Sequence, residues 1–234
     1  MHTDHLVGEM LFDLAVLKNL KLSLQELRNT VFFSRRSLLK IIQGSLDMYG
    51  LINEAVQGLV TENFGVDAWV KICAEAGLDH TDFVSMQQYP DSVTYDLVGA
   101  ASSVLGMTPE LILETFGRYW VQYVGSQAYG ELMDAAGTSL GEFLENLDHM
   151  HSRVMMSYPN LRPPSFRVQS HTEKEIILHY SSDRPGLCPL VVGLLYGLAD
   201  RFETRIEVDS LDGAGEGVTG IFKVTILNYH GENS

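Results

Sequence analysis

A proline-rich segment divides the sequence into two parts with different hydrophobic periodicity. The segment is "PNLRPPSF", residues 159–166, and it holds three of the seven prolines in the chain. Proline lacks a backbone N–H and fixes φ, so neither a helix interior nor a central strand accommodates this segment. Apolar residues recur at helical spacing before it and at strand spacing after it. The sequence therefore predicts an α+β fold, with a helical first half and a small antiparallel sheet in the second.

The expected elements follow from apolar periodicity and from capping residues. Thr108 and Ser139 are typical helix N-caps, and Pro109 suits the first helical turn. Before the proline-rich segment we expect helices over 48–65, 66–77, 92–106, 109–125 and 140–158, with a turn over 126–139. After it we expect strands over 165–170, 175–182, 204–211 and 220–229, and one helix over 189–202.

Composition and charge exclude several classes of protein. The chain has 234 residues, 45% hydrophobic and 20% charged, as in ordinary globular proteins. A formal charge of −14 disfavours a nucleic-acid or anionic-lipid surface, which needs clustered Lys and Arg. Cys73 and Cys188 have no metal-type spacing and are expected to be core thiols. With no membrane-span or signal pattern, we expect a cytoplasmic protein.

The charge is distributed unevenly. Residues 1–47 hold six Lys/Arg and five Asp/Glu, a net charge of +1, which leaves −15 for the rest of the chain. Apolar residues at helical spacing, around 11–20 and 38–42, predict helices in this first part. We expect residues 1–47 to be a helical N-terminal extension of unknown role, unless the natural start is Met48, and residues 48–234 to form the functional domain.

His151 lies on the apolar face of the helix expected over 140–158. At about 100° per residue it falls in line with Leu144 and Leu147, whereas His149 falls nearly opposite, among charged residues. The two imidazoles therefore cannot bind one metal from this helix. A lone histidine on an apolar face is either a hydrogen-bonded core residue or, as haem iron requires, an axial ligand.

Three polar residues spaced two apart end the strand expected over 175–182. Side chains two apart share a face of an extended chain, which would align Tyr180, Ser182 and Arg184. Taken in isolation, the pattern is typical of a strand entering a polar turn. It also offers two hydroxyls and a guanidinium to carboxylates. Haem carries two propionates, so a bound haem would explain both this pattern and His151.

From Met48 onward the chain resembles the haem nitric oxide/oxygen binding (H-NOX) family. The matching segments are "MYGLINEAV", "FGRYWVQY", "FLENLDHMH", "YPNLRPPSF" and "LHYSSDR". The family includes the gas-sensing domain of the soluble guanylate cyclase β subunit and stand-alone bacterial sensors, and the chain is most similar to cyanobacterial members. The resemblance implies haem b between a helical half and a small sheet.

The resemblance also implies roles for individual residues. His151 would bind the iron, and Tyr180, Ser182 and Arg184 would hold the propionates. Pro164 would pack against the porphyrin, and Ile52, Trp120 and Leu190 would lie on the distal side. Family members that bind oxygen stably have a tyrosine five residues after the signature arginine, where this chain has Pro189, followed by Leu190. This difference implies a ferrous haem that binds nitric oxide and CO and largely excludes oxygen.

The function implied is sensing without catalysis. Nitric oxide would break the bond between iron and His151, letting the haem and its helix relax. Asp148, one turn before His151, would tune that ligand. Because the sequence ends near the end of the family fold, the signal is expected to pass in trans to a histidine kinase or a cyclic-nucleotide or diguanylate signalling enzyme. The alternatives are an oxygen sensor or carrier of the same fold, and a haem-free interaction module.

Overall fold

The helices of the first half form where capping and periodicity predict them. The computed structural model describes residues 47–126, 129–211 and 218–228, which belong to one structural unit. The helices expected within residues 1–46 lie outside the described residues. The described helices before the proline-rich segment are α3 (Gly50–Phe64), α4 (Val66–Glu75), α5 (Asp91–Leu105), α6 (Pro109–Ser126), α7 (Gly130–Asp134) and α8 (Leu140–Ser157).

Local residues explain the helix boundaries. Gly65 and Gly106, with φ of 85° and 66°, end α3 and α5 in conformations that other residues adopt at a cost. At the start of α8, the Ser139 hydroxyl accepts a hydrogen bond from the Glu142 N–H at 3.3 Å. The expected Ser139 cap is therefore confirmed.

Two expected details are wrong. Met48 does not begin a helix, because β1 (Asp47–Tyr49) pairs with β2 (Gln88–Pro90) as a short antiparallel ribbon and α3 begins only at Gly50. The segment expected to be a turn, 126–139, contains the short helix α7. Neither element has a local signal, because β1 depends on a partner about forty positions away and α7 has only five residues.

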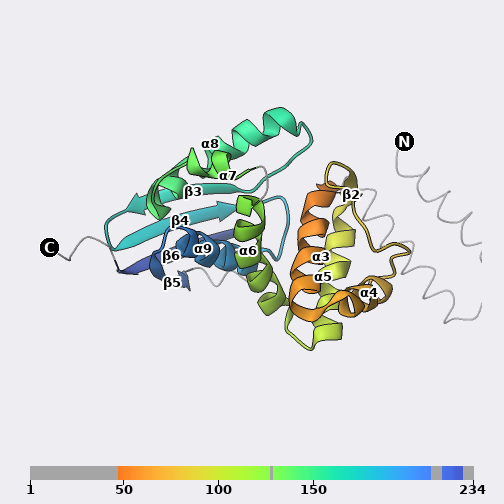
Figure 1. The fold of residues 1–234 in the computed structure, drawn as a ribbon. Coiled ribbons are helices and arrows are strands. Elements are labelled where there is room, and N and C mark those ends of the chain that lie inside the picture. Colours follow the sequence, from red (N-terminus) through yellow and green to blue (C-terminus); the bar gives the residue numbers. More distant parts are fainter. Residues whose placement is uncertain (1–46, 127–128, 212–217, 229–234) are drawn as a thin grey trace, which may run out of the picture. The chain divides into compact units, whose positions relative to one another are not determined.

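The second half forms the expected antiparallel sheet. Its strands are β3 (Ser165–His171), β4 (Glu175–Ser181), β5 (Arg205–Ser210) and β6 (Thr219–Asn228), in the order β3-β4-β6-β5 (Figure 1). Alternate residues of β4, namely Ile176, Leu178 and Tyr180, are buried. They pack in one cluster with Val191 and Leu195 of α9 (Cys188–Arg201), the helix predicted between the second and third strands. The predicted α+β class is confirmed.

Helices α6 and α9 are in unusually close contact. A Cβ added at Gly193 would lie 1.9 Å from the carbonyl oxygen of Glu114, and one added at Gly117 would lie 2.2 Å from that of Leu190. Only glycine leaves room for this approach of two backbones. The contact between these two helices is the most extensive between any two described elements.

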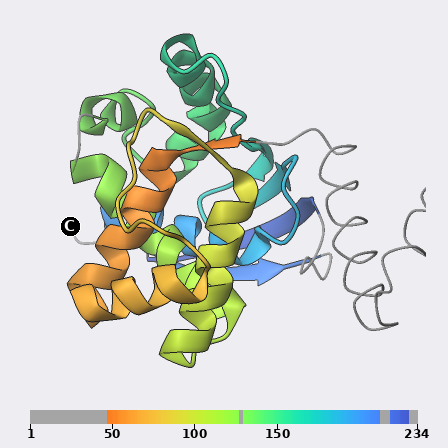
Figure 2. The same ribbon diagram turned by 90° about the vertical axis from the view of Figure 1, so that its right-hand side faces the viewer.

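The hydrophobic core has two clusters, and α6 contributes to both. One cluster joins α3, α4, α5 and the first half of α6, and the other joins the sheet with α8, α9 and the second half of α6. Figures 1 and 2 show α3, α4 and α5 grouped on the opposite side of α6 from the sheet. Phe116 belongs to the first cluster and Val121 to the second.

None of the described helices has by itself both the length and the apolar composition of a membrane span. Helices α5 and α6 have them only when taken together, and the chain bends by 111° between the two.

Candidate functional site

A large apolar cavity separates the two hydrophobic clusters. Its volume is about 320 Å³, and side chains from both clusters line it. Protein interiors rarely contain voids much larger than a water molecule, whereas small-molecule sites have volumes of roughly 300–1,000 Å³. The cavity therefore has the size and lining of a ligand site. The following candidate residues all line it: Ile52, Trp120, His151, Pro164, Tyr180, Ser182, Arg184 and Leu190.

His151 is one of the residues that line this cavity. It projects from the face of α8 that carries the buried Leu144 and Leu147, whereas His149 is exposed, as the helical spacing predicts. The Nδ1 atom of His151 is buried and has no hydrogen-bond partner among the described residues. Burial lowers the pKa of the imidazole, although the Asp148 carboxylate and the backbone of Pro164 oppose that change. A neutral imidazole nitrogen without a partner is suited to binding a metal.

Asp148 fixes the helix that carries His151. Its carboxylate accepts hydrogen bonds from the Ser165 hydroxyl at 2.7 Å and from the Phe166 N–H at 2.8 Å, so it joins α8 to the beginning of β3. The ring of Phe166 in turn lies against His151, with centroids 6.2 Å apart. The carboxylate that the sequence placed beside His151 thus has a positioning contact as well as an electrostatic effect.

The three polar residues at the end of β4 reach the same cavity in a different way from that predicted. Strand β4 ends at Ser181, so only Tyr180 projects from a strand face, and Ser182 and Arg184 belong to the following turn. The turn arises because the Ser182 hydroxyl accepts a hydrogen bond from the Arg184 N–H at 3.0 Å. Burial raises the pKa of Tyr180, which keeps its hydroxyl protonated and able to donate.

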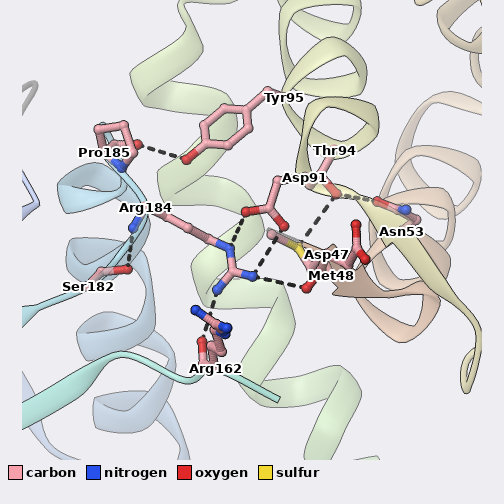
Figure 3. Close-up of polar contacts among 10 residues, drawn as sticks. All are labelled: Asp47, Met48, Asn53, Asp91, Thr94, Tyr95, Arg162, Ser182, Arg184 and Pro185. Atoms are coloured by element: carbon pink, nitrogen blue, oxygen red, sulfur yellow. Dashed lines mark hydrogen bonds and ion pairs between the residues drawn. The ribbon is translucent and has the colours of Figure 1, made fainter. Parts of the chain in front are cut away.

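Arg184 is held by the protein through most of its donors (Figure 3). Its Nε and Nη2 donate to the two oxygens of Asp91 at 2.7 and 3.1 Å, Nη1 donates to the carbonyl of Arg162 at 2.9 Å, and Nη2 donates to that of Asp47 at 3.2 Å. A guanidinium has five N–H groups, so one of the two on Nη1 has no partner among the described residues. Most of the Arg184 donors thus serve the protein itself, and its expected contact with a propionate stays a prediction.

Sequence reasoning missed three residues around Arg184. Asp91 neutralises it from α5, 93 positions away, and Tyr95 on the same helix donates a hydrogen bond to the carbonyl of Pro185 at 2.9 Å. Burial, followed by the Asp91 charge, raises the pKa of Tyr95 to about 12. Arg162 is a lining residue of the cavity, and its guanidinium has no ion-pair or hydrogen-bond partner within the described ranges. It lies in the proline-rich segment, which was the one available signal.

A group of tyrosines at the cavity was also not predicted. Tyr129 and Tyr158 are hydrogen-bonded through their hydroxyls, and Tyr49 packs edge-on against Tyr158 with centroids 5.2 Å apart. All three line the cavity. Burial, followed by the hydrogen bond, raises the pKa of Tyr129 to about 12, so its hydroxyl stays neutral at physiological pH.

On the side expected to be distal, the cavity is mainly hydrophobic. Leu190, Ile52 and Trp120 line it, and Pro189 is not among the lining residues. The indole of Trp120 packs on Phe116, with centroids 6.1 Å apart, and its N–H has no hydrogen-bond partner among the described residues. Among the three residues expected on the distal side, Trp120 is the one that can donate a hydrogen bond.

Comparisons with known proteins agree on one kind of domain. A family model described as HNOB, Haem-NO-binding, matches residues 49–210. The soluble guanylate cyclase gcy-33 of Caenorhabditis elegans is 34% identical over 155 residues, which are 66% of this chain and 16% of that protein. Soluble guanylate cyclase 89Da of Drosophila melanogaster is 29% identical over 182 residues, 76% of this chain and 27% of that protein. The chain thus spans about a quarter or less of these relatives.

Solved structures show the same fold. An H-NOX protein from S. oneidensis in the Fe(II)NO state has a TM-score of 0.69 and 22% identity, covering 77% of this chain and all of that one. An oxygen-binding H-NOX domain related to soluble guanylate cyclases, in its oxygen complex, has a TM-score of 0.64 and 18% identity, covering 80% of this chain and 99% of that one.

Proposed function

Because the chain belongs to the Haem-NO-binding family, whose domains are haem gas sensors, we propose that its cavity holds haem b and that the protein senses nitric oxide. The observation that carries this proposal is one apolar cavity whose wall contains both a histidine nitrogen without a partner and a group of carboxylate-binding donors. We propose residues 48–234 as the sensor domain and residues 1–47 as an N-terminal extension.

The residues of this cavity fit a haem. His151 would hold the iron, and Pro164 and Ile52 would contact the porphyrin. Near Arg184, the hydroxyls of Tyr180 and Ser182 and the remaining N–H of Arg184 would bind propionate, and the guanidinium of Arg162 adds charged donors. When bound, the iron supplies the site for a diatomic gas.

The choice of nitric oxide over oxygen rests on the distal lining. The solved relatives include an Fe(II)NO state and an oxygen complex, so the fold alone is compatible with either gas. Bound oxygen is polarised and gains from a hydrogen-bond donor, whereas nitric oxide needs little such help. Of the residues expected on the distal side, Leu190 and Ile52 offer no donor, and the Trp120 indole offers one. These residues favour nitric oxide and CO.

The route of the signal follows from how α8 is attached. His151 would tether the cavity side of α8, while Asp148 pins the same helix to β3 through Ser165 and Phe166. Loss of the tether when nitric oxide binds would release α8 about this fixed point. A gas shifts such an equilibrium only by its differential affinity for the two states, and the bond to His151 would provide that difference. We propose that a histidine kinase or a cyclic-nucleotide or diguanylate signalling enzyme reads the movement in trans, in the cytoplasm, and that the domain itself has no catalytic activity.

The absorption spectrum of the ferrous protein tests this function. We expect a Soret band that shifts with nitric oxide to a five-coordinate spectrum and stays unchanged in air. A stable ferrous–oxygen spectrum would instead identify an oxygen sensor or carrier. If the Trp120→Phe variant then lost that spectrum, the Trp120 indole would be the hydrogen-bond donor to the bound oxygen. If the protein showed no Soret band after expression with added haem, the remaining interpretation would be a haem-free interaction module.

Histidine substitutions test the iron ligand. We expect His151→Gly to lose haem and to recover it with added imidazole, because imidazole can replace the missing side chain. His149→Gly is the matched control on the exposed face of the same helix and should retain the wild-type spectrum. Equal haem retention by both variants without imidazole would contradict the assignment of His151.

A further inference from the structure

Three stacked aromatic rings on α6 lie between the cavity and an exposed carboxylate. Trp120 lines the cavity and stacks on Tyr123, with centroids 6.2 Å apart and an interplanar angle of 25°. Tyr123 stacks on Tyr119, with centroids 5.9 Å apart and an angle of 30°. The spacings are i to i+3 and i to i+4, which place the three rings on one helix face. The stack is therefore built into the geometry of a single helix.

The outer end of the stack is a hydrogen bond to an exposed carboxylate. The Tyr119 hydroxyl donates to Oε1 of Glu62, on α3, at 2.8 Å. A Cβ added at Gly58, one turn before Glu62, would lie 2.6 Å from that hydroxyl oxygen. Glycine at this position thus gives the hydroxyl room to approach α3. Aromatic stacks are commonly core packing, but a pair of tyrosines that ends on a surface carboxylate has a further capability.

We propose that Trp120, Tyr123 and Tyr119 form a one-electron relay between the cavity and the surface, with Glu62 as the proton acceptor. Tryptophan and tyrosine are the aromatic side chains that lose one electron most readily. A tyrosine must also lose its proton when it is oxidised, and the Glu62 carboxylate lies within hydrogen-bond distance to take it. The relay would carry oxidising equivalents out of the cavity when a one-electron oxidant, such as haem treated with peroxide, arises there.

The transfer balances in electrons and protons. The oxidant takes one electron from Trp120, leaving an indole radical cation. Tyr119 then gives one electron, through Tyr123, to restore Trp120, and passes its hydroxyl proton to Glu62. The products are a Tyr119 phenoxyl radical and a neutral Glu62 carboxyl group, with the oxidant reduced by one electron.

Pulse radiolysis of the full chain prepared without haem tests the relay. Azide radical takes one electron from an accessible indole and becomes azide ion. Trp120 is partly exposed, whereas Trp69, the other tryptophan, is 1% exposed. We expect the tryptophanyl absorption to be replaced by tyrosyl absorption at a rate independent of protein concentration. This phase should be lost in Trp120→Phe and in the double variant Tyr119→Phe/Tyr123→Phe.

Matched variants separate the relay from general packing. Glu62→Gln should slow the conversion in the wild-type background and should have no further effect when Tyr119 is phenylalanine, because the carboxylate acts only through that hydroxyl. Tyr89→Phe, in strand β2 and outside the stack, should leave the rate unchanged. A rate unaffected by removing both Tyr119 and Tyr123, in variants whose thermal unfolding matches the wild type, would overturn the relay. Because no haem is present, this outcome is independent of the proposed gas sensing.

Discussion

Arg184 shows how one side chain can serve both a fold and a ligand site. It is 8% exposed, and its ion pair with Asp91 joins the turn after β4 to α5. A buried charge that loses its partner is costly, because neither water nor another group replaces the lost interaction. Arg184 therefore joins three segments that line the cavity, whether or not it also binds a carboxylate of a ligand.

Asp91→Asn should destabilise the protein strongly. Removing one partner of a buried pair costs about 3 kcal/mol or more in the free energy of unfolding. Asp200→Asn is the matched control, because Arg118 and Asp200 form the same two-pronged pair with side chains 60% and 56% exposed. An exposed pair contributes less than about 1 kcal/mol. Urea unfolding measures the stability change of both variants. Equally small losses of stability would mean that the carbonyls of Arg162 and Asp47 hold Arg184 without the Asp91 carboxylate.

At the scale of elements, the contact of α6 with α9 fixes one wall of the cavity. Trp120 and Phe116 come from α6 and Leu190 comes from α9, so the distance between these helices sets the position of the distal lining. Glycines at the crossing allow that distance. The residues at this crossing must therefore be small enough for the two backbones to come close, as well as hydrophobic.

Gly193→Ala should destabilise this contact. The added Cβ would meet the backbone at Glu114, which cannot rotate away, and overpacking of this kind costs about 1–3 kcal/mol. Gly99→Ala on α5 is the control, because nothing lies within 4 Å of its added Cβ. There the change should stabilise the helix by roughly 0.5–1 kcal/mol. In thermal or urea unfolding, the changes in stability of the two variants should have opposite signs. Stabilisation by both substitutions would contradict the close packing of α6 and α9.

The start of α8 should contribute a pH-dependent stability. The Glu142 carboxylate accepts hydrogen bonds from the Thr138 N–H and hydroxyl, which lower the Glu142 pKa below 4.5. As the pH falls below that value, Glu142 binds a proton more readily in the unfolded chain than in the folded one. The stability that these hydrogen bonds contribute is therefore complete above pH 4.5 and is lost as the pH falls further. Glu142→Gln should weaken the acid dependence of unfolding. Glu75→Gln, an exposed carboxylate without a hydrogen bond in the described structure, should leave it unchanged.

At the scale of the whole described unit, the cavity interrupts the core. The helices α3 to α5 and the sheet bury separate hydrophobic clusters, and α6 places fully buried side chains in both. A ligand filling the 320 Å³ between them would add contacts on both sides. Ligands that bind only the folded state stabilise it by mass action, by about 2.7 kcal/mol at a hundredfold excess over Kd.

Haem should therefore stabilise the unit more than protoporphyrin IX does. Both fill the cavity, but only haem offers iron to His151, so the difference in unfolding temperature reports that bond. The difference should disappear in His151→Gly and persist in His149→Gly. If haem and the iron-free porphyrin stabilise the wild-type protein equally, no bond to His151 forms. Thermal unfolding at matched excess of each porphyrin measures this.

Much of the fold could be predicted from the sequence because its signals are local. The bounds of α5, α6 and α8 agree with prediction to within one residue, since Thr108, Ser139 and the following glycines or prolines determine them. The exposed face for His149 and the inner face for His151 likewise follow from 3.6 residues per turn. The sequence alone thus established the family, the faces of α8 and the types of most elements, but not β1, β2 or α7.

Only the tertiary structure decided what meets across the cavity. Asp91 reaches Arg184 over 93 positions and Arg162 reaches it over 22, and no periodicity in either segment reports such contacts. The same holds for the pairing of β1 with β2 and for the cavity itself, which exists because two separately packed clusters do not close on each other. Local interactions fix which face a side chain occupies, but its partners depend on how the elements pack, and that is a property of the whole folded unit.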